Sequence, residues 1–199
     1  MKISHILYII LFLLVACKSQ EKDDNRIKIT AMDSSHLKAE PQNFFPVTNF
    51  IKGQIFEIKN GGVNPMKFVT INKHTDSAWL KMEDINKEVS DFLTPEIDTA
   101  NLTTLFAEKK FMDQTLDAIT FTYDPIKSLP DSFVLRHWDV YVDPNKSMVR
   151  RVYLVKNLPG KKTQLLTWET GKSCNIKNVS ADSSGKPLIE KEISIKWRF

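Results

Sequence analysis

The stretch from Ile119 to Trp197 alternates between apolar and polar side chains, and this period of two constrains the fold more than any other feature. Successive residues of a strand point to opposite faces of a sheet, so the alternation is typical of strands with one buried face and one wet face. Turn sequences such as Pro144-Asn145-Lys146-Ser147 separate the alternating stretches and indicate antiparallel neighbours. The predicted strands cover residues 119–123, 137–142, 149–156, 164–168, 174–179 and 189–197.

The part of the chain before these strands has helical spacing. An apolar stripe followed by Gly61-Gly62 predicts a helix that ends near residue 59. We expect strands at 66–72 and 77–81, a second helix over 82–93 before Pro95, and a third helix over 101–111. Helices first and strands afterward predict the α+β class, with an antiparallel, curved sheet and about three helices packed on one face. The stripe consists of Val47, Phe50, Ile51, Ile55 and Ile58.

The N-terminus carries a different signal. Lys2 precedes an apolar run from Ile6 to Leu14, which is shorter than the about 20 residues of a spanning helix and is typical of a secretory leader. The run ends in Leu14-Val15-Ala16-Cys17, which resembles the lipobox of bacterial lipoproteins. That resemblance implies removal of residues 1–16 and acylation of Cys17, so that several acyl chains hold the protein at a membrane.

The polar segment after Cys17 predicts a flexible tether over residues 17–43, and we expect a single domain over 44–199. Its acidic cluster resembles the surface-export signals of Bacteroidota lipoproteins, and the whole-chain layout resembles short lipoproteins of that group. The resemblance implies an outer-membrane lipoprotein, on either the periplasmic face or the cell surface. No functional residue beyond Cys17 follows from it.

Motifs for common cofactors are absent from the sequence: there is no G-x-G-x-x-G, phosphate loop, H-E-x-x-H or C-x-x-C. We therefore expect no cofactor and no metal site, and we assign no catalytic residue.

Cys174 has no disulfide partner once Cys17 is acylated. We interpret it as a buried small residue, with a nucleophilic role as the alternative. Trp197 falls on the apolar side of the last predicted strand, so we expect it in the core.

The most suggestive polar group shares one face of one predicted strand and consists of His137, Asp139, Tyr141 and Asp143. Their spacing would let a base, an orienting acid and a phenol cooperate. The simpler interpretation is that these residues form the solvent-exposed face of a strand whose other face is apolar.

Charge is distributed unevenly along the sequence. Residues 76–144 carry 6 basic and 14 acidic side chains, whereas residues 145–199 carry 12 basic and 4 acidic side chains. We expect the two halves to neutralise each other, with an anionic partner of Arg150, Arg151, Lys161, Lys162 and Lys172 as the alternative.

Two functions remain open. The first is a non-enzymatic binding or assembly module, anchored to the membrane through Cys17, with a protein or an apolar or anionic ligand as partner and no role in nucleic-acid binding. The sheet could offer it an apolar cleft or a protein-docking edge, and a cavity lined by Trp and Phe without converging polar groups would support it. The second is a small cell-envelope hydrolase that uses the His137 and Asp139 face. It requires a pocket in which His137 reaches Asp139 and a nucleophile.

Overall fold

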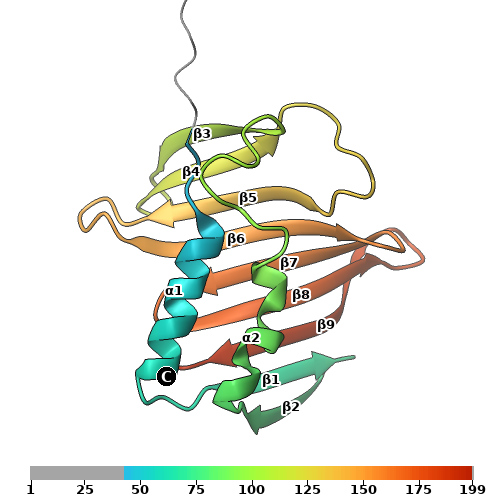
Figure 1. Ribbon diagram of the computed structural model, residues 1–199. Helices are drawn as coiled ribbons and strands as arrows, with labels where there is room; N and C mark the ends of the chain where they lie inside the picture. The colour runs from blue at the N-terminus through green and yellow to red at the C-terminus, as the bar shows by residue number, and fades with distance from the viewer. Residues whose placement is uncertain (1–42, 199) are drawn as a thin grey trace, which may run out of the picture. The chain divides into compact units, whose positions relative to one another are not determined.

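A computed structural model describes residues 43–198, and these are built on one nine-stranded antiparallel sheet (Figure 1). The strand order is β2-β1-β9-β8-β7-β6-β5-β4-β3, so the seven strands from β3 to β9 form a continuous meander. The first two strands join as a hairpin beside β9. The strands are β1 (Met66–Ile71), β2 (His74–Trp79), β3 (Phe106–Asp113), β4 (Ala118–Pro125), β5 (Leu135–Val142), β6 (Val149–Leu158), β7 (Lys162–Glu169), β8 (Ser173–Ala181) and β9 (Pro187–Lys196).

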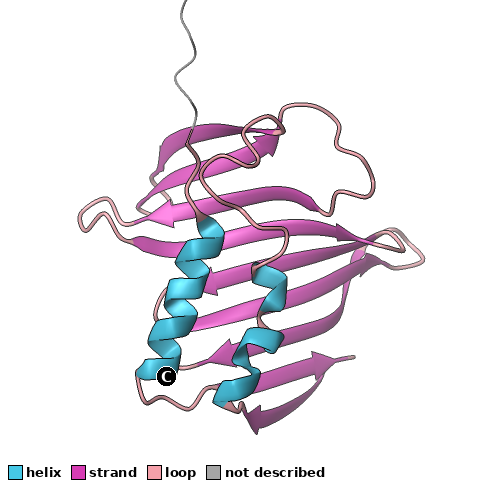
Figure 2. Cartoon of the chain, viewed as in Figure 1, coloured by secondary structure: helices cyan, strands magenta, loops and turns pink. Residues whose placement is uncertain are grey.

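Helix α1 (Val47–Asn60) crosses one face of this sheet, and the short α2 (Ile85–Glu88) lies on the same face (Figure 2). The apolar stripe of α1 is turned toward the sheet, because Val47 and Ile51 are fully buried. Gly61 ends the helix by donating its amide to the Glu57 carbonyl at 2.8 Å. The prediction of this first helix is confirmed.

The expected α+β class with about three helices is wrong, because residues 43–198 form mostly antiparallel sheet and contain two α-helices. The predicted helix over 82–93 is broken into a 3₁₀ turn, Met82–Asp84, then α2, then a second 3₁₀ turn, Ser90–Phe92. The Ser90 hydroxyl donates to the Lys87 carbonyl at 2.9 Å, and such side-chain bonds compete with helical ones.

The predicted helix over 101–111 is also wrong, since most of it lies in β3. All eight residues of β3 pair with β4, from Phe106 opposite Pro125 to Asp113 opposite Ala118. The apolar spacing of Leu102, Leu105 and Phe106 fits a helix, but the hydrogen-bond ladder offered by β4 outweighs this weak local preference.

The C-terminal strand β9 lies inside the sheet, between β1 and β8. Trp197 directly follows it and is buried, with its ring 5.1 Å from that of Trp168, which confirms the predicted core position. Ile189 differs from the expectation because it is 49% exposed. A register shift between Asn178 and Val179 on β8 lies opposite this part of β9 and interrupts the regular alternation.

Aromatic side chains fill the layer between the helices and the sheet. Trp138 stacks on Tyr123 with ring centroids 4.5 Å apart, and Phe92 packs edge-on against Trp168 at 5.2 Å. Trp138 and Trp168 are both fully buried. The layer between the helices and the sheet is therefore filled by the protein's own core. Among the described residues, no helix has the length and hydropathy required to cross a bilayer.

Candidate functional site

His137 lies between two carboxylates on the face of the sheet opposite the helices. Its neighbour Trp138 points into the core, so the alternation of β5 directs His137 outward. His137 Nδ1 is 2.9 Å from Asp124 Oδ1, and His137 Nε2 is 3.1 Å from Asp139 Oδ2. Asp124 belongs to the adjacent strand β4, so the imidazole links two strands.

Asp139 collects further donors although it is buried. The Thr122 hydroxyl donates to Asp139 Oδ1 at 2.6 Å, and the Tyr141 hydroxyl donates to Asp139 Oδ2 at 3.1 Å. Burial alone would raise the pKa of Asp139, but the bonds from His137, Thr122 and Tyr141 and the charge of His137 outweigh it, so the pKa lies below its ordinary value. Desolvation raises the pKa of Tyr141 to about 12, which keeps the phenol protonated.

These contacts favour the charged form of His137. The bond to Asp139 is the largest influence and raises its pKa against the opposing effect of burial, and Asp124 acts in the same direction. An imidazolium donates from both nitrogens and has no lone pair left to accept a proton. The group of His137, Asp124, Asp139, Thr122 and Tyr141 therefore ties β4 to β5, and we call it the clasp.

The sequence predicted part of this cluster. His137, Asp139 and Tyr141 do share one face of one strand, as expected from their spacing. Asp124 and Thr122 were missed, although the alternation of Thr120, Thr122 and Asp124 against Phe121 and Tyr123 was visible. Only the pairing of Thr122 with Asp139 across the two strands brings the two sets together.

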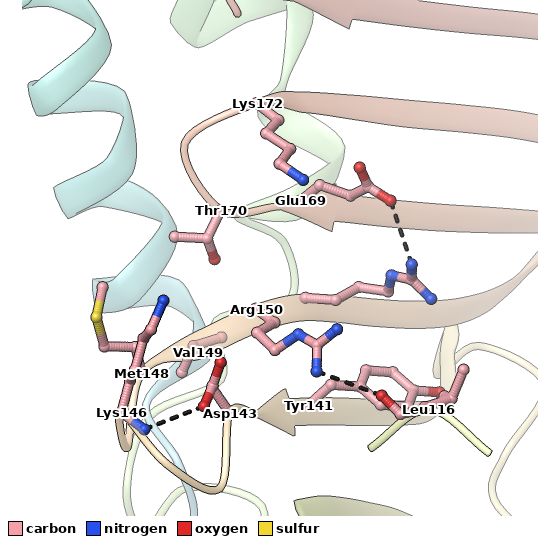
Figure 3. Close-up of a pocket in the computed structure, with 11 residues that line it drawn as sticks. Leu116, Tyr141, Asp143, Lys146, Met148, Val149, Arg150, Glu169, Thr170 and Lys172 are labelled. Carbon is pink, nitrogen blue, oxygen red and sulfur yellow. Dashed lines mark hydrogen bonds and ion pairs between the residues drawn. The ribbon is translucent and has the colours of Figure 1, made fainter. Parts of the chain in front are cut away.

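A second feature adjoins the clasp at one end of the sheet. It is a half-open hollow of about 300 Å³ that we call the cationic hollow, and Tyr141 belongs to both features (Figure 3). Four basic and two acidic side chains line it, which gives a net charge of +2. The lining residues are Leu116, Tyr141, Asp143, Lys146, Met148, Val149, Arg150, Arg151, Glu169, Thr170 and Lys172.

Three hairpin turns build the cationic hollow. The β3–β4 turn supplies the carbonyls of Leu116 and Asp117, which accept from Arg150 Nη1 at 3.3 and 2.8 Å. In the β5–β6 turn, Asp143 accepts the backbone amides of Asn145 and Lys146 at 2.9 and 3.0 Å.

These two amide bonds to Asp143, the Lys146 bond first, hold the pKa of its carboxyl below the ordinary value. The third turn, between β7 and β8, places Thr170 and Lys172 at the hollow. The positions of all these side chains therefore depend on backbone hydrogen bonds at the strand ends.

The cations of the hollow differ in their partners. Arg151 forms an ion pair with Glu169 at 3.2 Å, and its guanidinium lies 5.7 Å from the centre of the Tyr141 ring. By contrast, Lys146, Arg150 and Lys172 form no ion pair with any carboxylate of residues 43–198.

The basic residues singled out in the sequence thus divide into two groups. Arg150, Arg151 and Lys172 meet at the cationic hollow, where the sequence did not predict the additional contribution of Lys146. Lys161 and Lys162 lie at a separate hollow, and Lys162 is neutralised there by Glu190 at 2.6 Å.

The remaining candidates are accounted for individually. Cys174 is buried and unpaired, which confirms its predicted structural position, and burial raises the pKa of its thiol to about 12. Lys156, which the sequence analysis did not identify, is buried beneath the 3₁₀ turn Ser90–Phe92 and donates to the carbonyls of Asp91 and Thr94.

Within residues 43–198 no three His, Cys, Asp or Glu side chains converge to hold a metal ion. Cys17 lies outside the described residues.

A scan against protein-family models matched none, and searches of curated proteins and of solved structures found no significant similarity. The function has to be inferred from the chain's own residues.

Proposed function

We propose that this chain is an exported bacterial lipoprotein of the outer membrane, anchored through Cys17, and that its folded domain is a non-enzymatic binding module. The anchor rests on the Leu14-Val15-Ala16-Cys17 motif after a short apolar leader. Acylation of Cys17 would hold the domain at the membrane surface, on the periplasmic face or at the cell exterior.

The observation that carries the binding function is the cationic hollow. Lys146, Arg150 and Lys172 expose positive charge without a carboxylate partner in the described part of the chain, which is a favourable environment for an anion. An apolar ligand between the helices and the sheet is disfavoured, because Trp138 and Trp168 fill that space.

A hydrolase remains the alternative, since His137, Asp139 and Tyr141 are linked by hydrogen bonds. The clasp argues against it for two reasons. Both nitrogens of His137 are occupied by carboxylates, and Tyr141 already donates its proton to Asp139. To act as a general base, His137 would first have to break its contact with Asp124 or with Asp139.

Metabolic labelling with a fatty acid tests the anchor. The wild-type chain should become acylated and fractionate with membranes, and Cys17→Ala should lose both properties. The matched control is Cys174→Ala, which removes the buried thiol and should leave acylation unchanged. Acylation that persists in Cys17→Ala would contradict the assignment.

Complementation of a deletion strain separates binding from hydrolysis. Asp139→Asn and His137→Gln should retain the envelope phenotype of the wild type within a few-fold, provided that circular dichroism shows them folded. An acid–base role predicts losses of about 10²–10⁴-fold for the same variants. Losses of that size in a folded variant would favour the hydrolase.

A further inference from the structure

We propose that the cationic hollow binds a phosphate monoester, an inference that rests on the proposed binding function and names its ligand class. Charge is the first argument. A phosphate monoester carries about −1.5 to −2 charges at neutral pH, which matches the net charge of +2 of the lining side chains. A carboxylate would neutralise only half of that charge.

The geometry of Arg150 is the second argument. Its Nη1 atom alone makes both bonds to the carbonyls of Leu116 and Asp117, so the guanidinium is held in place while Nη2 and Nε remain able to donate. A guanidinium fixed in this way is suited to phosphate oxygens, with Lys146 and Lys172 as additional point charges.

The hydroxyl of Thr170 supplies the third argument. Its Oγ1 atom is buried at the hollow and has no hydrogen-bond partner among the described residues. Buried hydroxyls nearly always have a partner, and Thr170 Oγ1 would donate to a ligand oxygen once its side chain turns into the hollow.

The rim of the hollow indicates what is attached to the phosphate. Met148 is 58% exposed and Leu116 is 39% exposed, and both line the hollow. They would contact a short carbon skeleton joined to the phosphate. The volume of about 300 Å³ is at the small end of the range for ligand sites, which suits a compact phosphate ester or a phospholipid headgroup.

The other basic hollow differs in how its cations are bound, although Arg136 Nε there is also buried without a hydrogen-bond partner among the described residues. There Arg136 donates to the carbonyls of Leu129 and Pro130 from both terminal nitrogens, and Lys162 is paired with Glu190. Arg136 and Lys161 have no carboxylate partner among the described residues of that site, compared with three such cations in the hollow around Arg150. The comparison favours the hollow around Arg150.

Isothermal titration calorimetry tests the proposal on the full-length chain purified in mild detergent and phosphate-free buffer. The probes are glycerol 3-phosphate, glycerate and glycerol, which differ in the charged group on a similar skeleton. Glycerol 3-phosphate should bind best. Arg150→Gln combined with Lys172→Gln should weaken it at least about tenfold, because each lost charge-assisted bond contributes more than 1 kcal/mol.

The control variant is Lys81→Gln combined with Lys87→Gln, which removes the same charge from exposed positions elsewhere. It should bind like the wild type. Binding of glycerol 3-phosphate that is no tighter than that of glycerate, or that weakens equally in the control, would overturn the phosphate assignment. The binding function would survive such a result if the complementation experiment supports it, so the two failures are distinguishable.

A second arm identifies the source of the phosphate. Co-sedimentation compares phosphatidylcholine vesicles with and without phosphatidic acid, using the Cys17→Ala chain so that acylation does not contribute. Retention only with phosphatidic acid, lost in the Arg150 and Lys172 double variant, indicates a lipid headgroup. Binding of glycerol 3-phosphate without vesicle retention indicates a soluble phosphate ester. Failure of both phosphate probes to bind contradicts the proposal.

Discussion

His137 Nε2 lies 3.1 Å from Asp139 Oδ2, although only one residue separates the two along β5. The contact turns one ring nitrogen of His137 along its own strand, while the other reaches Asp124 on β4 at 2.9 Å. Two carboxylates therefore hold one imidazolium across a strand pair. The same residues that resemble a catalytic group in the sequence form a clasp that ties β4 to β5.

Replacement of His137 by Gln should change the pH dependence of unfolding. The pKa of His137 is raised above 6.5, so its contribution is complete below about pH 6.5 and is lost as the pH rises through the raised pKa. The pKa values of Asp124 and Asp139 are lowered below 3.8, so their contribution is present above that pH and is lost as the pH falls through the lowered values.

The clasp is thus strongest in mildly acidic solution. Urea unfolding at about pH 5.5 should show His137→Gln less stable than the wild type by about 1–3 kcal/mol, and the difference should shrink at about pH 9. His74→Gln is the matched control, because it removes an exposed imidazole on β2, away from the clasp. A difference independent of pH would contradict an ionic clasp.

Lys156→Met should alter stability in alkaline solution. Burial lowers the pKa of Lys156 to about 8, from an ordinary 10.5, although Asp91 opposes the shift. Between these values the unfolded chain binds more protons than the folded chain, so the wild type gains stability as the pH rises. Relative to Lys156→Met, the gain should reach up to about 3 kcal/mol. Denaturant unfolding of both proteins between about pH 8 and pH 10.5 measures this difference. If Lys156 were solvated, the free energies of unfolding of the two proteins would change with pH in the same way.

Trp197→Ala should strongly destabilise the domain. Trp197 is 7% exposed and packs against Trp168, and loss of a core Trp typically costs about 3–5 kcal/mol. Trp79→Ala is the matched control, because Trp79 lies on the edge strand β2 and is 63% exposed. Thermal melts of both variants should show a large loss only for Trp197→Ala. Equal melting temperatures would mean that the chain end contributes little to the core.

Cys174 should resist alkylation in the folded protein. Its pKa of about 12 leaves almost no thiolate at neutral pH, and its side chain is buried. In a Cys17→Ala background, where Cys174 is the only thiol, iodoacetamide should react at least about 10³-fold faster after denaturation. Mass spectrometry of the modified protein measures both rates. Rapid labelling of the folded chain would revive the reactive-thiol interpretation.

The sequence predicted the elements whose patterns are long and unambiguous. The stripe from Val47 to Ile58 predicted α1, and the alternation around Trp138 and Trp197 predicted strands with these side chains inside. It failed over 82–93 and 101–111, where few apolar residues fit more than one period. There the choice between helix and strand depends on partners that are distant in the sequence, such as β4 for β3.

The sequence by itself predicted the periodic elements α1 and the strands around Trp138 and Trp197, and the common face of His137, Asp139 and Tyr141, because all of these are local relations along the chain. Tertiary structure decided that Asp124 closes the clasp, and that Leu116, Arg150 and Lys172 meet at one hollow. These contacts join residues of different strands and turns. Their positions follow from the order and register in which nine strands pair, which no single stretch of sequence specifies.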